Sequence, residues 1–214
     1  MKSNIFIRAF TFNAFNENTY IVHNDVRQAI LIDPGCSDLN ERKILQSYIK
    51  KEGLTPTHII NTHCHIDHVL GNKWCKETYQ IPLWIPEGEQ LILDNLMNVS
   101  RMYGVPAEAS PIPDFYMNET SHIDINGITW QLISAPGHSP ASICLYHEPT
   151  HDLIAGDVLF LESIGRTDLT GGNHQLLLKN IREKLFTLPI QTKVYPGHGP
   201  TTTIGHEKIH NPFL

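Results

Sequence analysis

The sequence predicts a mixed α/β fold on three observations. Strand-like segments alternate with segments of helical periodicity along the chain. The composition is that of a globular protein, because 41% hydrophobic and 18% charged residues supply enough apolar side chains for a sizeable core. The 214 residues contain no low-complexity segment, internal repeat or linker, so we expect one domain over residues 1–214.

The first third of the chain is predicted to contain strands and one helix. The apolar run at 29–32 indicates a buried strand, which Asp33-Pro34-Gly35 ends as a turn. A helix follows, because Ser37 or Asp38 can cap its start, Gly53 can end it, and apolar side chains recur between them on one face. Two earlier strands are expected at 5–10 and 19–23.

The rest of the chain alternates strands and helices in the same way. Apolar spacing predicts helices at 89–103, ended by Gly104, and at 175–186. Residues 105–119 are rich in proline and are expected to run over the surface, where they shape either a pocket or an interface. Further strands are expected at 57–61, 82–85, 128–134, 141–146, 153–155 and 192–195.

Charge and hydropathy exclude several classes of function. Acidic residues outnumber basic ones by 22 to 16 and no basic run exceeds Lys50-Lys51, so nucleic acid is not an expected partner. No stretch approaches the ~18 apolar residues of a membrane span, and Arg8 interrupts the N-terminal segment before a signal-peptide core could form. We therefore expect a cytoplasmic protein that binds no membrane and keeps its four scattered cysteines reduced.

Histidine is the unusual residue, with 13 in 214 positions. The strand expected at 57–61 is followed by Thr62-His63-Cys64-His65-Ile66-Asp67-His68, and later strands by Pro136-Gly137-His138, Gly156-Asp157 and Pro196-Gly197-His198. Sites in α/β proteins are assembled at strand ends, because a rigid sheet positions the loops there. These turns are therefore expected to form the functional site.

The residue types in these turns indicate a metal site. Imidazole and carboxylate groups without a required thiolate suit zinc, iron or manganese, and the set is large enough for two ions. Because His63 and His65 are two apart in an extended segment, they point the same way and can bind one ion. Asp67 and His68 can face a second ion, and Asp157 can bridge the pair. The candidate ligands are His63, His65, Asp67, His68, His138, Asp157 and His198.

Two other features of the sequence compete with this cluster as functional signals. The pattern His-x-His-x-Asp-His arises by chance in about 0.002 of chains of this composition, whereas the protease-type zinc motif His206-Glu207-Lys208-Ile209-His210 arises in about 0.04. Gly205 and Asn211-Pro212 leave no room for a helix of several turns or a downstream third ligand, so we expect a C-terminal tail that packs on the domain. Cys64 is expected to point into the core as a small buried side chain rather than to act as a nucleophile.

The order of these motifs resembles the metallo-β-lactamase superfamily over nearly the whole chain. The resemblance rests on the segment from Thr62 to His68, on Asp33-Pro34-Gly35 before it, and on His138, Asp157 and His198 after it. Gly165-Arg166-Thr167-Asp168 and the final Asn211-Pro212-Phe213-Leu214 resemble the short bacterial branch of glyoxalase II-like hydrolases. The resemblance implies an αββα sandwich of two mixed sheets with helices on the outer faces.

The resemblance also implies a role for each ligand. His63, His65 and His138 would hold one ion, Asp67, His68 and His198 the other, and Asp157 both. Asp33 would steady the ligand loop, although a turn-forming Asp before Pro explains it equally well.

Two departures from glyoxalase II bear on the substrate. The full-length enzymes carry a helical C-terminal domain that helps to bind glutathione, whereas here the sequence ends soon after His198, so no separate C-terminal helical domain is expected. The segment after Asp157 also lacks the Lys- and Tyr-bearing sequence that contacts glutathione there, so that specificity does not carry over. Arg166 is the nearest basic candidate for a substrate carboxylate, and pairing with Asp168 or with a neighbouring loop is the structural alternative.

The activity implied by the resemblance is hydrolysis of a small acyl thioester of the lactoylglutathione type. Two divalent cations, zinc or else iron or manganese, lower the pKa of a shared water toward ~7, so a metal-bound hydroxide can attack the carbonyl while Asp67 orients it. Alternatives on the same fold are a mononuclear iron persulfide dioxygenase, a lactonase or β-lactamase, and a non-catalytic metal-binding module. The expected partner is a small-molecule thioester or ester, and the sequence leaves the oligomeric state open.

Overall fold

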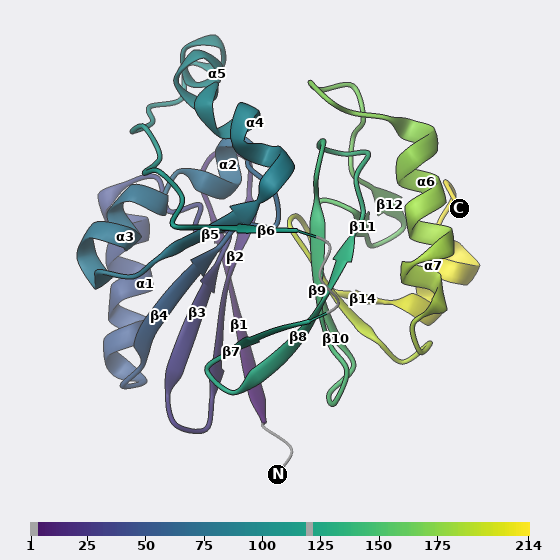
Figure 1. Cartoon of the computed structure of the whole chain (residues 1–214), viewed down its shortest axis with the longest axis horizontal. Helices are drawn as coiled ribbons and strands as arrows, with labels where there is room; N and C mark the ends of the chain where they lie inside the picture. Colours follow the sequence, from purple (N-terminus) through teal and green to yellow (C-terminus); the bar gives the residue numbers. More distant parts are fainter. Residues whose placement is uncertain (1–3, 119–121) are drawn as a thin grey trace. The chain divides into compact units, whose positions relative to one another are not determined.

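The computed structural model describes residues 4–118 and 122–214 of the chain, which fall into two compact units. Unit 1 is Met1–Met117 and unit 2 is Asn118–Leu214. Within the described residues each unit is built on its own six-stranded mixed sheet (Figure 1), in agreement with the predicted α/β class. The expectation of one domain over residues 1–214 stays a prediction.

The sheet of unit 1 has the strand order β1-β2-β3-β4-β5-β6. The first three strands are antiparallel neighbours, and β3 to β6 run parallel. The strands are β1 (Ile5–Phe12), β2 (Glu17–Asn24), β3 (Gln28–Ile32), β4 (Thr55–Ile60), β5 (Leu83–Pro86) and β6 (Phe115–Met117). The helices are α1 (Leu39–Lys51), α2 (Ile66–Val69), α3 (Asn72–Tyr79), α4 (Gln90–Asp94) and α5 (Leu96–Tyr103), with a 3₁₀ turn at Glu87–Glu89.

The parallel pairing of β3 with β4 positions the candidate site in unit 1. Ile32 is the register partner of Ile60, so the residues that follow both strands emerge at the same edge of the sheet. The backbone N–H of Asp33 donates to the carbonyl oxygen of Ile60 at 2.9 Å, which holds the two loops together. The turn predicted at Asp33 therefore begins beside the histidine-rich segment.

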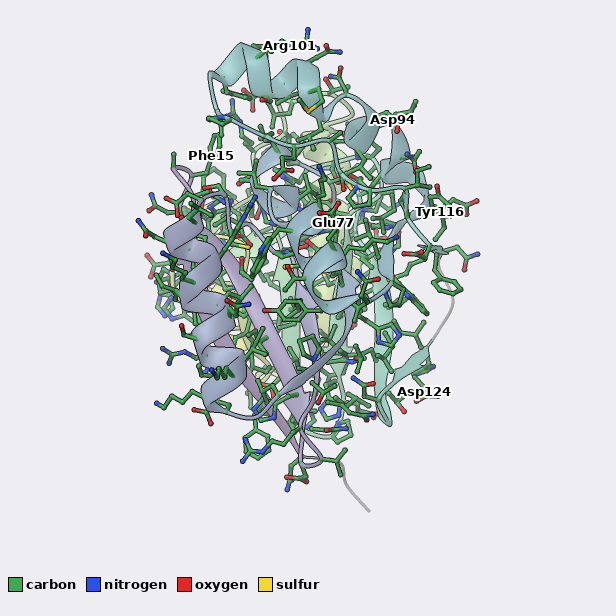
Figure 2. All side chains as sticks on the ribbon, turned by 90° about the vertical axis from the view of Figure 1, so that its left-hand side faces the viewer. Phe15, Glu77, Asp94, Arg101, Tyr116 and Asp124 are labelled. Atoms are coloured by element: carbon green, nitrogen blue, oxygen red, sulfur yellow. The ribbon has the colours of Figure 1, made fainter. Side chains whose placement is uncertain are left out.

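Helix α1 forms as its sequence signals predict. The Asp38 side chain accepts hydrogen bonds from the backbone N–H groups of Asn40 and Glu41, and so caps the helix. Leu45 and Ile49 are buried in the apolar core of unit 1. Figure 2 views the face of unit 1 that carries α1 and α3, with Glu77 of α3 near its centre.

The helix predicted at 89–103 is interrupted. It is divided into the 3₁₀ turn, α4 and α5, with Asn95 between the two α-helices. The Asn95 side chain accepts a bond from Asn98 at 2.7 Å, and asparagine is a poor residue for a helix interior because its amide competes with backbone hydrogen bonds. The prediction that Gly104 ends the helix is confirmed, since it adopts the left-handed conformation at the C-cap of α5. In the segment predicted to cross the surface, residue 119 lies outside the described residues.

The sheet of unit 2 has the order β14-β13-β10-β9-β8-β7, and β11 and β12 form a separate hairpin. Its apolar core includes Leu177 and Ile181 of helix α6 and Ile204 of helix α7. The strands are β7 (Ile123–Ile125), β8 (Ile128–Ser134), β9 (Ile143–His147), β10 (Asp152–Gly156), β11 (Leu159–Phe160), β12 (Ser163–Ile164), β13 (Lys193–Pro196) and β14 (Thr202–Thr203). The helices are α6 (His174–Glu183) and α7 (Ile204–His210), with a 3₁₀ turn at Leu185–Thr187.

Strands β10 and β13 of unit 2 are parallel, and Gly156 is the register partner of Pro196. The backbone N–H of Gly197 donates to the carbonyl oxygen of Gly156 at 2.8 Å. Because both strands end at this bond, the residues that follow them, Asp157 and His198, start from neighbouring points of one sheet edge.

Among the described residues, no helix is long and apolar enough to cross a membrane. The cytoplasmic location stays a prediction.

Candidate metal centre

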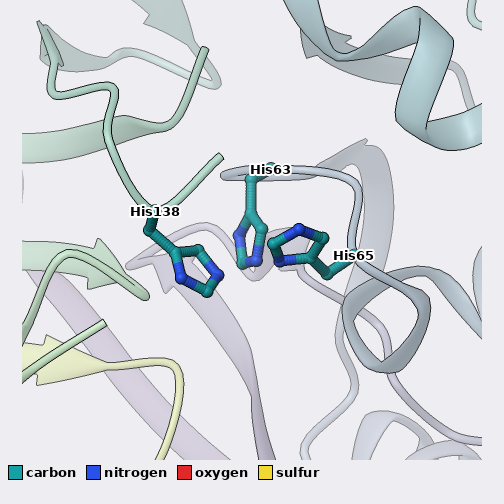
Figure 3. Close-up of side chains that lie close together, drawn as sticks. All are labelled: His63, His65 and His138. Carbon is teal, nitrogen blue, oxygen red and sulfur yellow. The ribbon is translucent and has the colours of Figure 1, made fainter. Parts of the chain in front are cut away.

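The ligand loop of unit 1 connects β4 to α2 and is largely buried. The side chains of His63, Asp67 and His68 are buried, whereas His65 is half-buried at the start of α2. The rings of His63 and His65 have centroids 4.8 Å apart at 90° to one another. The two imidazoles therefore lie together, and their binding to one ion stays a prediction. Figure 3 shows both side chains on the loop after β4.

Asp33 holds the ligand loop from the neighbouring strand end. Its Oδ1 accepts the backbone N–H of Thr62 and its Oδ2 accepts the Thr62 hydroxyl, both at 2.7 Å. Its Oδ2 also lies 3.2 Å from Nδ1 of His68. A carboxylate on Nδ1 leaves Nε2 of His68 as the nitrogen that can bind a metal ion. Because both oxygens of Asp33 are engaged in this way, Asp33 fits a role in orienting the loop better than a role as a ligand.

Asn13 supports the loop from unit 1's first hairpin, and Glu17 is buried close enough to His68 to feel its charge. The Asn13 amide donates to the backbone carbonyls of Gly35 and Asp67, each at 3.0 Å. Burial raises the pKa of the Glu17 carboxyl well above its usual range, although the nearby His68 lowers it. Neither residue carried a sequence signal, because each is distant in sequence from the ligand loop.

Cys64 points away from the histidine pair, as predicted. Its side chain belongs to the apolar core of unit 1, and its backbone N–H donates to Glu89 Oε2 at 3.0 Å. Burial raises the pKa of the Cys64 thiol well above its ordinary value, and the charges of Glu89 and Asp33 add to this shift. A thiol in this state is a poor nucleophile. The four cysteines are all buried and free, and their reduced state stays a prediction.

The ligand residues of unit 2 meet at Asp157. Its Oδ2 lies 3.4 Å from Nε2 of His138 and 3.4 Å from Nε2 of His198. His138 is 2% exposed and Asp157 is 7% exposed, so most of this cluster is withdrawn from water. One cluster is thus formed by residues from three turns. These turns are at least 19 residues apart in the sequence, and their positions at strand ends predicted that they meet.

The segment that follows the β11–β12 hairpin orients His138. Nδ1 of His138 lies 2.7 Å from the carbonyl oxygen of Arg166, an acceptor that requires the proton on Nδ1 and leaves Nε2 for a ligand. This approach depends on Gly165, because a Cβ at that position would lie 1.9 Å from the backbone oxygen of Asp157 and 3.0 Å from Nδ1 of His138. Gly165 is therefore a functional residue that sequence reasoning noted only as part of a family motif.

Arg166 pairs with Asp168 on the surface. Its Nε and Nη2 donate to the two carboxylate oxygens of Asp168 at 2.7 and 2.6 Å. Hydrogen bonds from Arg166 lower the pKa of Asp168 to about 2. Arg166 therefore pairs with Asp168, which was the structural alternative to binding a substrate carboxylate.

The donor set fits divalent cations. Two ligand atoms that are each about 2.1 Å from a tetrahedral ion lie about 3.4 Å apart, which is the separation between Asp157 and each of its histidines. In unit 1, Oδ2 of Asp67 lies 3.7 Å from Nε2 of His68, a similar separation. Both units therefore present imidazole and carboxylate atoms at ligand spacing. The assignment of all seven residues to shared ions stays a prediction.

The protease-type motif at the C-terminus lies in the short helix α7, and the tail expected here is therefore helical. Its glutamate, Glu207, is 1% exposed and accepts hydrogen bonds from Thr202, from Asn211 and from the backbone N–H of Glu162. A catalytic base must reach the substrate, and this carboxylate faces the protein interior. The structure therefore supports the prediction that the segment packs on the domain and is not a protease site.

The family comparisons agree with this geometry. Residues 13–208 match the family model described as "Metallo-beta-lactamase superfamily". A relative from Bacillus subtilis, "Probable metallo-hydrolase YqgX", is 39% identical over 199 residues, with 92% of each chain covered. "Hydroxyacylglutathione hydrolase GloC" from Haemophilus influenzae is 32% identical over 203 residues, with 94% of each chain covered.

Solved structures also resemble this chain. The crystal structure of BLEG-1 B3 metallo-β-lactamase has a TM-score of 0.91 and 37% identity, and the match covers 98% of this chain and 99% of that chain. The structure of TTHA1623 in a di-iron-bound form has a TM-score of 0.87 and 32% identity, and it covers 97% and 100% of the two chains. The predicted fold is therefore confirmed, and the chain belongs to the metallo-β-lactamase superfamily, as a metallo-hydrolase.

Proposed function

We propose that this metallo-hydrolase cleaves a small acyl thioester at a dinuclear metal centre. The observation that carries the proposal is Asp157, because one carboxylate flanked by two histidine nitrogens at 3.4 Å is suited to bridge two cations. The likeness to hydroxyacylglutathione hydrolase GloC supports a thioester as the substrate.

The proposed centre combines the ligands of both units. His63, His65 and His138 would bind one cation, and Asp67, His68 and His198 the other, with Asp157 bound to both. Zinc suits this nitrogen and oxygen donor set, and the di-iron form of TTHA1623 supports iron as the alternative. Bound cations of this kind supply a water nucleophile near neutral pH and polarise the substrate carbonyl.

The residues of this chain would fix the geometry of the reaction. Asp33 and the Arg166 carbonyl hold His68 and His138 in orientations that leave Nε2 available. Asp67 would orient the attacking water through its carboxylate. The water oxygen adds to the thioester carbonyl carbon, the C–S bond breaks, and the sulfur leaves as a thiolate that takes a proton from solvent.

Arg166 is not proposed as the residue that binds the thiol portion of the thioester. Because its guanidinium is bonded to both oxygens of Asp168, contact with a substrate carboxylate would require that pair to break. We therefore propose a small acyl thioester without a requirement for glutathione.

The test is thioester hydrolysis by the purified chain with its metal content measured in parallel. We expect lactoylglutathione and a simpler acyl thioester to be hydrolysed, with two metal ions per chain and loss of activity after chelation. Asp67→Asn should lower kcat by at least 100-fold, whereas Asp25→Asn, an exposed carboxylate outside the ligand loop, should leave it unchanged. An untouched rate after chelation would contradict the proposal, as would one iron per chain with thiol-dependent oxygen uptake, the behaviour of a persulfide dioxygenase.

A second candidate is β-lactam hydrolysis, which the likeness to BLEG-1 B3 metallo-β-lactamase favours. Both reactions place a water on a carbonyl carbon, but the β-lactam leaving group is an amine that needs a proton. A chromogenic β-lactam assayed beside the thioesters separates the two, and a higher kcat/KM for the β-lactam would make it the preferred substrate class.

A further inference from the structure

Helix α7 carries two histidines on one surface. His206 and His210 are four residues apart, so their side chains lie one turn apart on the same face. Their ring centroids are 4.6 Å apart, with 35° between the ring planes. His206 is half-buried and His210 is exposed. Two imidazoles spaced in this way on a helix can bind one metal ion together.

A carboxylate completes a triad with this pair. Oε1 of Glu162, in the turn between β11 and β12, lies 3.0 Å from Nε2 of His206. The turn is fixed to the helix, because the backbone N–H of Glu162 donates to Glu207 at 2.9 Å and the Asn211 amide donates to the carbonyl of Ser163 at 3.0 Å. Glu162 is therefore held at the helix by contacts other than its own side chain.

Two lysines near this pair have their ammonium groups over aromatic rings. The ammonium of Lys208 lies over the ring of Phe186, 5.8 Å from its centroid. Lys193 lines the same surface hollow of about 300 Å³ as His206, but its ammonium lies 4.7 Å from the ring centroid of Tyr195. The hollow gives solvent access to His206, so water can fill the coordination positions that the protein leaves open.

We propose that His206, His210 and Glu162 form a second metal site, which binds a divalent transition-metal cation such as Zn²⁺, Ni²⁺ or Cu²⁺. Two imidazoles bound to one tetrahedral ion have centroids about 5 Å apart, close to the separation in α7. The three ligand atoms do not yet converge within 4.8 Å, so His210 must rotate, which its exposed side chain is free to do. None of the three residues belongs to the candidate metal centre, so this site is separate from the proposed catalytic function.

A bound cation would join two elements of unit 2. It would link α7 to the β11–β12 turn, which is followed by Gly165 and by the Arg166 carbonyl that orients His138. The expected effect is a metal-dependent increase in the stability of unit 2 and one more bound ion per chain than the catalytic centre accounts for.

The test is a Zn²⁺ titration of the untagged full-length protein, already loaded at its catalytic centre, in competition with a chromogenic chelator. We expect one further equivalent to bind. His206→Gln and His210→Gln should each weaken binding of this further Zn²⁺ by at least roughly 100-fold, the upper value for loss of a residue that only contacts a metal ligand. Glu162→Gln should weaken it by roughly tenfold. Gln preserves helix propensity, so the variants should keep their fold, which far-UV circular dichroism checks. Retention on a Ni²⁺-charged column gives an independent readout.

The matched control is His174→Gln, which removes an exposed histidine at the start of another helix. It should bind the extra Zn²⁺ like the wild type, and all four variants should retain the basal thioesterase rate. The proposal is overturned if the wild type binds no extra equivalent, if the α7 variants bind it with unchanged affinity, or if His174→Gln loses it. An unchanged affinity in Glu162→Gln would remove Glu162 from the site.

Discussion

At the scale of single residues, the candidate centre depends on side chains and carbonyls that orient the ligands. Asp33 contacts Thr62 twice and His68 once, so one carboxylate controls both the path of the loop and the direction of an imidazole. The Arg166 carbonyl does the same for His138. Such contacts set which ring nitrogen carries the proton and therefore which one can bind a cation.

Asp33→Asn tests this role because it keeps the size of the side chain and removes its charge. The new amide nitrogen cannot accept a bond, so one buried donor of Thr62 loses its partner at a cost of about 1–3 kcal/mol. The loss of the carboxylate beside His68 should weaken metal binding by about 10–100-fold. Chelator competition measures the affinity, with Asp25→Asn as a control that should change neither quantity. Wild-type affinity in Asp33→Asn would show that the carboxylate only forms the turn.

Gly165→Ala tests how closely the backbone after the β11–β12 hairpin approaches His138. The added Cβ would lie 1.9 Å from a backbone oxygen, so this segment must move and the bond from His138 to the Arg166 carbonyl must lengthen. We expect metal affinity to fall by roughly 10–100-fold. The control is Gly53→Ala. Gly53 has a φ of 61°, so alanine there should cost about 1 kcal/mol of folding stability, but its Cβ would meet nothing within 4 Å. It should lower the Tm without changing metal affinity, and equal effects in both variants would contradict this role.

At the scale of elements, signals within a short stretch of sequence were sufficient for most of the fold. The cap at Asp38 and the stop at Gly104 lie where predicted, because capping depends on neighbouring residues. Helix α3 was not predicted; it is only eight residues long, and its buried residues are Asn72 and Cys75. The break at Asn95 was missed because its apolar neighbours keep the helical spacing on both sides.

In the candidate site, too, some residues could be predicted from the sequence pattern and others could not. The ligands are recognisable from sequence because His-x-His-x-Asp-His is rare, and the strand ends predicted that His138, Asp157 and His198 meet. The residues that orient them could not be predicted with confidence from spacing. The contact from Arg166 is made by its backbone carbonyl, which every residue type has, so the sequence gives no sign of it. Asn13 bonds to the backbone of Asp67, which is 54 positions away in the sequence.

Glu108 joins two helices of unit 1, and its contribution to stability should depend on pH. Its carboxylate bonds to Lys73 of α3 at 2.9 Å and to Arg42 of α1 at 3.1 Å. Hydrogen bonds from Lys73 and Arg42 lower the pKa of Glu108 below its ordinary 4.5. Because the pKa is lower in the folded chain than in the unfolded chain, the stabilisation is complete above pH 4.5 and is lost as the pH falls through the folded value.

Glu108→Gln should therefore lower the free energy of unfolding by about 0.5–1 kcal/mol at pH 7, since the group is partly exposed and screened by solvent. The difference from the wild type should shrink below pH 4.5 and in high salt. Urea unfolding at several pH values measures it. Glu183→Gln, which removes an exposed carboxylate 4.0 Å from Lys179, should have a smaller effect. A difference that grows in acid would have the wrong sign for this mechanism.

At the scale of the whole molecule, the proposed centre would couple metal binding to folding of both units. Unit 1 supplies His63, His65, Asp67 and His68, and unit 2 supplies His138, Asp157 and His198. An ion that binds only the folded chain stabilises it by about 2.7 kcal/mol at 100 times its Kd. Because the unfolded chain lacks the arrangement of ligands, this binding energy adds to the stability of the fold.

Removal of the metal should therefore lower the Tm of the whole protein by about 5–10 °C, since 1 kcal/mol shifts the Tm of a chain of this size by roughly 2–4 °C. Differential scanning calorimetry with and without chelator measures the shift, and readdition of Zn²⁺ should restore the Tm. His198→Gln should lose most of the shift because it removes a ligand, whereas His174→Gln should keep it. If chelation shifts the Tm equally in wild type and His198→Gln, the stabilising ion is bound elsewhere, and the seven residues do not form one centre.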